Sequence, residues 1–517
     1  MHRCAVSVYR LLVLFPCLLA AVATARAATV TVSGQVGLEQ DGRLLPLRDV
    51  AVSDGRRIVR TGADGRYVLE TTPGRPVFVV KPSGHAFPAG ADGLPRFWAA
   101  APQGGDEARI DFSLRRVAPR AQTEVLLFAD TQVGNEREIG YYRRSVVEPL
   151  GRPRAALGVT LGDMVNDQPG LYPALNAVTA SLGVPWFHVP GNHDMDPGAV
   201  EDSEALRQWS AVYGPDTYAV EEGAAAFVFM DDVVLKPGGG YIGGLREDQF
   251  QFLEQYLAGL PPQRLLVLGV HIPLFDAAGR QTFRADDRRR LFALLRRHPK
   301  VLVLSAHSHE QRHYWHGADD GWDGGAPLHE FNLGAVCGSF WSGLDDAAGV
   351  PLATMADGTP RGHGLLQVRA DGSYRLQYRP SVRLAQEDPS FTAGMAVHAP
   401  RVLRRGAYPA WGVYANVFMG DAETRVEFRV DGGPWQAMRR VERADPRLLL
   451  ENVADDLADG LRSLDRSPEA SASPHLWRGA LPTRLAAGVH EVQVRAVDRW
   501  GGEVVAATRY RLEEARP

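Results

Sequence analysis

The sequence has few cysteines for its length. Only three occur among 517 residues, and two of them, Cys4 and Cys17, lie within the first 27 positions. If that segment is removed, Cys337 remains alone, which excludes an intrachain disulfide. A chain this long can instead rely on hydrophobic cores, and it has room for about two to four domains.

The sequence also lacks a strong charge imbalance. It carries 57 basic and 61 acidic residues, and it shows no internal repeat, heptad run or low-complexity tract. Loss of Arg3, Arg10 and Arg26 would leave 54 basic residues and a net charge near −7. This balance argues against a general binder of nucleic acids or anionic membranes, and the composition is that of an ordinary globular protein.

Only one long apolar run is present, and it lies at the N-terminus. Arg10 precedes a leucine-rich stretch that continues to Ala23, and Ala25-Arg26-Ala27 fits a small-residue cleavage site. We therefore expect a signal peptide over residues 1–27, a periplasmic or secreted protein, and no transmembrane segment in the mature chain. An uncleaved anchor is the alternative, but the run is short and contains Pro16. Bulky residues before Cys17 disfavour a lipoprotein.

Short strands with alternating apolar and polar residues are expected in both end regions of the chain. Residues 28–118 contain several such strands separated by Asp-Gly turns, which predicts a β-sandwich similar to transthyretin-like or carboxypeptidase-regulatory-like modules. Residues 381–517 show the same alternation at 425–430 and 490–496, which predicts a second, immunoglobulin-like β domain. Contact with the cell envelope or a glycan through these domains stays open.

Between them, residues 119–380 alternate apolar strands with helical patterns. Helices are expected at 247–257 and 286–297, where apolar residues recur three and four apart. Strands are expected at 125–128, 158–161, 186–189, 226–229, 265–268 and 301–304. This pattern predicts a layered α/β or α+β core between two all-β sandwiches.

Five of these strands are followed directly by polar residues that can bind metals. The carboxyl ends of strands in open α/β sheets are where binding sites form, so we expect these side chains to meet. In chain order the segments are Asp130-Thr131-Gln132, Gly162-Asp163, Gly191-Asn192-His193-Asp194, His271 and His307-Ser308-His309.

Such a cluster suits a pair of divalent ions acting on a phosphate. Two ions about 3.5–4 Å apart can hold a hydroxide and clamp the substrate between them. The pair needs a bridging carboxylate and several neutral imidazoles. One further imidazole, off the metals, is needed to protonate the leaving oxygen.

The five segments, in this order, resemble the calcineurin-like metallophosphoesterases. The likeness spans roughly residues 124–378 and, with the flanking β regions, is closest to a bacterial secreted subgroup that has a dedicated C-terminal domain. The resemblance implies hydrolysis of a phosphate mono- or diester by a metal-bridging hydroxide. It implies a first ion on Asp130, Gln132 and His309, a bridging Asp163, a second ion on Asn192, His271 and His307, His193 as the acid, and Asp194 as its support.

Gln132 departs from the common pattern, which has histidine at this place. A carboxamide oxygen is a harder ligand than imidazole, so among Mn, Fe, Zn and Mg the sequence favours Mn. This form also resembles Mn-dependent nucleotide-diphosphate pyrophosphatases, which is one alternative function. A cell-envelope or glycan-binding protein with an inactive core is the other.

The sequence allows two roles for each of several further residues. Asp167 can support the site or cap a turn, and Arg137 can contact phosphate or lie on the surface. The glycine-rich segment 332–343 and residues 355–360 can form the rim of the site or pack against the C-terminal domain. Cys337 is expected to be buried and inert.

Overall fold

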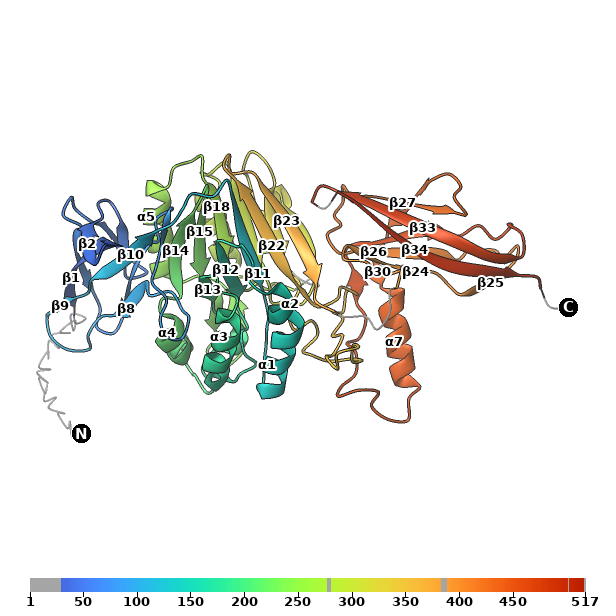
Figure 1. The fold of residues 1–517 in the computed structure, drawn as a ribbon, viewed down its shortest axis with the longest axis horizontal. Helices are drawn as coiled ribbons and strands as arrows, with labels where there is room; N and C mark the ends of the chain where they lie inside the picture. The colour runs from blue at the N-terminus through green and yellow to red at the C-terminus, as the bar shows by residue number, and fades with distance from the viewer. Residues whose placement is uncertain (1–28, 277–279, 383–387, 501, 516–517) are drawn as a thin grey trace, which may run out of the picture.

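The protein is elongated, with a helix-covered core between two β regions (Figure 1). The computed structural model describes residues 29–276, 280–382, 388–500 and 502–515, so the expected signal peptide lies outside the described residues. Among the described residues, no helix is long and apolar enough to cross a membrane.

The core contains two mixed sheets. The first has the spatial order β13 (Trp186–Val189), β12 (Leu157–Leu161), β11 (Gln122–Phe128), β22 (Gly362–Arg369) and β23 (Tyr374–Pro380). The second has the order β14 (Thr217–Glu222), β15 (Ala225–Met230), β18 (Leu265–Gly269), β19 (Val301–Ser305), β21 (Leu328–Asn332) and β20 (Arg312–His316). The predicted strands within both sheets are nearly continuous apolar runs because both of their faces are buried.

Apolar contacts join the two sheets and their helices into one core. The rings of Phe187 in β13 and Phe229 in β15 stack at 6.5 Å between centroids. Helix α1 (Glu136–Tyr142) packs on the first sheet through Tyr142 and Phe128, and Tyr142 is hydrogen-bonded to Thr179 in α3 (Tyr172–Ala180). The other core α-helices of the described residues are α2 (Glu148–Leu150), α4 (Arg207–Tyr213), α5 (Glu247–Gly259) and α6 (Ala285–Leu295).

The N-terminal region is all-β, as predicted. One group of strands consists of β1 (Val30–Gln40), β2 (Arg43–Pro46), β5 (Arg66–Thr71), β7 (His85–Ala86), β9 (Glu107–Arg109) and β10 (Phe112–Arg116). The other consists of β3 (Ala51–Ser53), β4 (Ile58–Arg60), β6 (Pro76–Val79) and β8 (Trp98–Ala100). Alternate residues of β5 are buried, and a separate apolar cluster fills this region.

The C-terminal region also packs two sheets around its own apolar cluster. Their main strands are β24 (Met395–His398), β26 (Gly412–Val417), β32 (Leu476–Ala480), β25 (Val402–Arg404), β27 (Arg425–Val430), β33 (Gly488–Asp498) and β34 (Gly502–Glu513). A single helix, α7 (Pro446–Asp456), interrupts the strands of the described part of this region. The predicted layered core with flanking sandwich-like regions is therefore present.

Candidate metal centre

Parallel pairing brings the polar strand ends together. Leu161 of β12 pairs with Val189 of β13, so Asp163 and Asn192 follow at the same edge of the first sheet. Gly269 of β18 pairs with Leu304 of β19, so His271 and His307 follow at the same edge of the second sheet. The site therefore forms where the carboxyl ends of the parallel strands of both sheets meet.

Asp163 lies at the centre of this cluster and is 1% exposed. Its Oδ2 is 3.0 Å from Gln132 Nε2 and 3.3 Å from His271 Nε2. Its Oδ1 accepts a 2.7 Å hydrogen bond from the backbone N–H of His193. A carboxylate that faces both groups of predicted ligands has the position that a bridging ligand requires.

Three predicted ligands form a compact group. Donor atoms of Asp163, His271 and His307 all lie within 4.8 Å of one another. His271 Nδ1 is 2.9 Å from the Leu161 carbonyl, and its Nε2 is 3.1 Å from Asn192 Oδ1. A proton on Nδ1, donated to that carbonyl, leaves the Nε2 lone pair directed at the cluster, which is how metal-binding histidines are oriented.

Asp130 and His309 form the other half of the cluster. Asp130 Oδ1 is 3.6 Å from His309 Nε2, and it is buried without a hydrogen-bond partner in the described structure. Asp130 Oδ2 accepts from the backbone N–H of His307. A buried carboxylate oxygen without a donor is costly unless a cation satisfies it, so this donor set fits a divalent ion.

The charges of the site also call for a cation. Burial raises the pKa of Asp130 well above its ordinary value, and repulsion from Asp163 adds to the rise. Burial opposes a charge on His271, but attraction to Asp163 outweighs it and raises the pKa of His271 to about 10. Protons thus compensate buried negative charge at the place where divalent ions would do so.

Five of the seven predicted ligands have a left-handed backbone conformation, which non-glycine residues rarely adopt. Their φ angles lie between 37° and 69°; the residues are Asp130, Gln132, Asp163, His307 and His309. Backbone of this kind is costly, and it collects at functional sites where it directs side chains. Here it turns the side chains of residues just beyond a strand into one cluster.

Two glycines allow the loops to approach closely. A Cβ on Gly191 would lie 2.2 Å from Asp163 Oδ1, and a Cβ on Gly162 would lie 2.4 Å from His271 Nδ1. Gly162 also has a φ of 87°, which a side chain would strain. Both positions need glycine because any larger residue would displace a predicted ligand.

Gln132 is in the cluster, but its amide is turned. The nitrogen faces Asp163, and the oxygen accepts a weak 3.5 Å contact from the thiol of Cys337. Rotation of the amide by half a turn would direct the oxygen at the Asp163 side. Cys337 is fully buried, and burial raises the pKa of its thiol well above the ordinary value, as expected for an inert cysteine.

His193 lies at the edge of the cluster, and its side chain is 28% exposed. Its Nδ1 is 3.1 Å from Asp167 Oδ1. The expected partner was Asp194, but that carboxylate accepts hydrogen bonds from Gly191 N, Met164 N and the Tyr172 hydroxyl. Asp194 turns inward because it caps the loop that carries His193, so Asp167 is the carboxylate that contacts the ring.

Aromatic rings flank the cluster on two sides. Phe340 stacks on His309 at 4.6 Å and is 56% exposed, whereas Tyr241 meets His307 edge-on at 5.8 Å. Trp341 is buried and donates to the Thr131 carbonyl. The segment 332–343 thus has two roles: Phe340 forms part of the rim, and Trp341 packs beneath the loop that carries Asp130 and Gln132.

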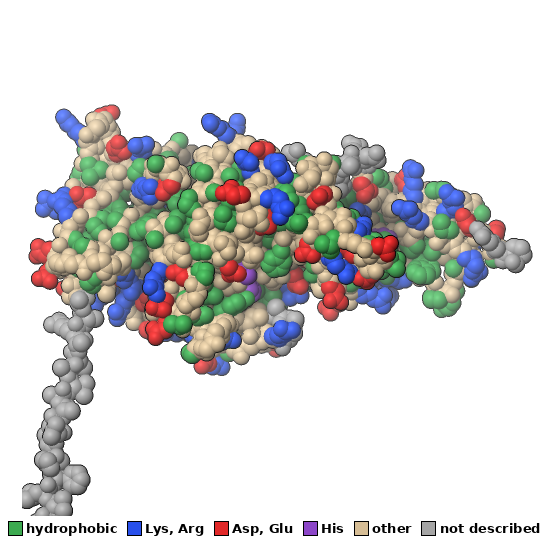
Figure 2. Space-filling view, turned by 90° about the horizontal axis from the view of Figure 1, so that it is seen from below, with side chains coloured by type: hydrophobic (Ala, Val, Ile, Leu, Met, Phe, Trp, Pro, Cys, Tyr) green, Lys and Arg blue, Asp and Glu red, His purple; other side chains and the backbone are tan. Residues whose placement is uncertain are grey.

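Figure 2 shows a histidine at the surface of the central part, beside acidic side chains.

Asp232 is a further residue of the site and is not among those predicted from the sequence. It is fully buried, and its carboxylate accepts from the backbone N–H groups of His271 and Ile272. Burial raises its pKa to about 8. Asp232 follows β15, so the rule applied to the other strand ends would also have found it.

Comparison with known sequences agrees with this geometry. Sequence models for the N-terminal part, the catalytic part and the C-terminal part of calcineurin-like phosphoesterases match residues 30–117, 123–311 and 330–503. The chain belongs to the calcineurin-like phosphoesterases. It is therefore a metal-dependent phosphoric ester hydrolase, and the resemblance expected from its sequence is confirmed.

Two solved structures match part of the chain at low sequence identity and low TM-score. The purple acid phosphatase PPD1 from yellow lupin (Lupinus luteus) seeds is 15% identical, covers 69% of this chain and 67% of its own, and gives a TM-score of 0.37. A structure of PhoD is 11% identical, covers 69% of this chain and 81% of its own, and gives a TM-score of 0.35. No curated protein matches the chain in sequence.

Proposed function

We propose that this phosphoesterase is an exported enzyme with two divalent ions that hydrolyses a phosphate mono- or diester. The first ion would be held by Asp130, Gln132 and His309, and Asp163 would bridge to the second. Asn192, His271 and His307 would complete the second site. The observation that carries the proposal is Asp163, buried between two groups of donors, with the unpartnered Asp130 oxygen on one side.

The ions, when bound, would neutralise phosphate oxygens and activate a water as the nucleophile. The protein's own contribution begins with His193, whose ring is outside the donor cluster and reaches solvent. A proton on His193 Nε2 can pass to the leaving oxygen while Nδ1 stays hydrogen-bonded to Asp167. Asp167 would thus fix the orientation of the ring.

Export is supported by the N-terminal sequence alone, namely the arginine-flanked apolar run and the Ala-x-Ala site before Ala28. The mature enzyme would then act in the periplasm or outside the cell. Manganese is the favoured metal because both Gln132 and Asn192 would offer neutral amide oxygens. A test of export is the N-terminal sequence of the protein recovered from the cell envelope or medium, which should begin at Ala28.

A nucleotide-diphosphate pyrophosphatase is the second candidate. Gln132 favours it by resemblance, and the exposed ring of Phe340 beside His309 could stack on a nucleobase. Under this alternative, Phe340→Ala should weaken turnover of a nucleoside diphosphate derivative and leave turnover of a small ester unchanged. Equal effects on both substrates would favour a simple ester.

The deciding experiment combines metal analysis with substrate turnover. The purified protein should contain about two divalent ions per chain, and a chelator should abolish activity that Mn²⁺ restores. Turnover of p-nitrophenyl phosphate, its bis ester and ADP-ribose would then separate monoesters, diesters and pyrophosphates. One ion per chain at full activity would contradict the dinuclear proposal.

A further inference from the structure

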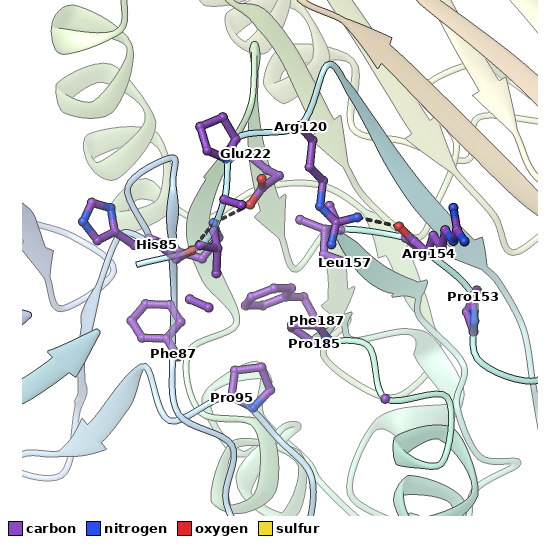
Figure 3. Close-up of a pocket in the computed structure, with 18 of the residues that line it drawn as sticks. His85, Phe87, Pro95, Arg120, Pro153, Arg154, Leu157, Pro185, Phe187 and Glu222 are labelled. Carbon is purple, nitrogen blue, oxygen red and sulfur yellow. Dashed lines mark hydrogen bonds and ion pairs between the residues drawn. The ribbon is translucent and has the colours of Figure 1, made fainter. Parts of the chain in front are cut away.

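A cavity lies away from the predicted ligands, where the N-terminal β region meets the core. Its volume is about 610 Å³. Its walls come from residues 81–95 and 117–122 on one side and from the amino ends of β12 and β13 on the other. Figure 3 shows side chains of both parts facing one space.

The cavity stands apart from the metal centre because the strands carry the two sites at opposite ends. Leu157, the first residue of β12, lines the cavity, whereas Asp163 follows the last residue of the same strand. A ligand in the cavity would not reach the predicted metal ligands. The cavity is therefore no extension of the site described above.

One part of the cavity is apolar and firmly built. Phe187 is 2% exposed, and its ring packs against Phe97, which in turn packs against Phe87. Pro95 and Leu157 add further buried apolar surface. In Figure 3, the rings of Phe87, Pro95 and Phe187 lie together below the charged groups. This part can accept a flat apolar body.

The charged groups leave an excess of positive charge. The cavity is lined by Lys81, Arg120 and Arg154 but by a single carboxylate, that of Glu222. Lys81 Nζ pairs with Glu222 at 2.7 Å and donates to the His85 carbonyl, so these two charges cancel within the wall. The excess therefore resides on the two arginines.

Neither guanidinium group is neutralised by a carboxylate in the described part of the chain. Arg120 donates to the backbone carbonyl of Arg154, which holds the two residues together at the rim (Figure 3). Arginine is suited to planar anionic groups because its fork can donate two parallel hydrogen bonds.

We propose that this cavity is an accessory binding site for a small amphipathic anion. The apolar body would lie on Phe87, Pro95 and Phe187, and its carboxylate, sulfonate or phosphate would meet Arg120 and Arg154. The occupant is separate from the substrate of the metal centre.

The probe for this site is 1-anilinonaphthalene-8-sulfonate, an aromatic anion whose fluorescence rises in apolar surroundings. Titration of the full-length, metal-loaded protein should give saturable binding with one site per chain. Arg120→Ala/Arg154→Ala should weaken binding at least tenfold. The matched control Arg116→Ala/Arg152→Ala removes the same charge from exposed neighbours outside the cavity and should change binding less than twofold.

Two competitors and one filled variant complete the test. Decanoate should displace the probe at least tenfold better than decanol, and inorganic phosphate at a concentration that inhibits the enzyme should not displace it. Ala156→Trp should fill the cavity and abolish binding while the circular dichroism spectrum is unchanged. Equal weakening by both double variants, displacement by phosphate, or full binding by the folded tryptophan variant would each overturn the proposal.

Discussion

His193 differs from the other histidines of the cluster because its ring contacts a carboxylate outside the predicted ligand set. Removal of the ring should leave the metal ligands in place. We expect His193→Ala to keep its metal content and to lose about 10²- to 10⁴-fold in kcat, the usual loss of a general acid. Steady-state kinetics and metal analysis of the same preparation measure both. His398→Ala, a partly buried histidine of β24, is the control. Loss of metal from His193→Ala would make it a ligand instead.

Gln132 determines which metal the first site prefers, if its amide oxygen is a ligand. Gln132→His replaces a hard oxygen by imidazole nitrogen and should raise the bound Zn²⁺ relative to Mn²⁺ when both are supplied. Gln132→Glu, which keeps an oxygen donor of similar size, should retain the Mn²⁺ preference. Mass spectrometric metal analysis after competition gives the ratio. An unchanged ratio in both variants would exclude Gln132 as a ligand.

The loops at the strand ends show what the sequence predicts well. Each apolar run marked a buried strand, and the polar residues after these strands lie close together because parallel strands end at one edge. The pairing of His193 with Asp167 was not predictable in this way. It depends on the left-handed φ of 57° at Asp167 and on the inward turn of Asp194, which follow from the loop geometry.

The loop between β13 and the short helix at Asn192 leaves no room for a side chain at Gly191. We expect Gly191→Ala to push Asp163 aside, since the new Cβ would lie 2.2 Å from Oδ1 and 2.4 Å from the backbone nitrogen. The free energy of unfolding should fall by about 1–3 kcal/mol, the usual cost of overpacking, and bound metal should fall with it.

Gly170→Ala is the matched control for this prediction, because nothing lies within 4 Å of the Cβ that it would add. Thermal unfolding and metal content should be those of the parent protein. If Gly191→Ala behaves like Gly170→Ala, the close approach to Asp163 is not needed for metal binding.

For the whole molecule, composition and alternation predicted an α/β core between two β regions, and that arrangement is present. The contacts between the regions were not predictable, because they join residues far apart in the chain. Asp357, before β22, accepts from the backbone N–H of Gln311, two residues beyond His309. It also meets His475 of the C-terminal region at 3.2 Å. The C-terminal region is thus bonded to the loop that carries two predicted ligands.

This contact predicts that the C-terminal region stabilises the metal loop. Asp357 and His475 are 0% and 1% exposed, so His475→Leu would leave a buried carboxylate with its backbone donors but without its side-chain partner, at a cost of about 3 kcal/mol in the free energy of unfolding. His490→Leu is the control, because its partner Asp431 is 47% exposed. This substitution should lower the free energy of unfolding by about 1 kcal/mol or less. Chemical denaturation of both variants measures the difference, and metal content should fall only in the first.

The same pair predicts a dependence on pH. Burial opposes the charge of Asp357, but hydrogen bonds from His475 and from backbone amides outweigh it and lower the pKa of Asp357. A lowered pKa in the folded state contributes stability above the unfolded pKa, and this contribution is lost as the pH falls through the folded pKa. The gap in unfolding free energy between the parent protein and His475→Leu should therefore be largest near neutral pH and narrow in acid. A gap that stays constant from neutral pH into acid would show that His475 acts by packing, not by stabilising the Asp357 charge.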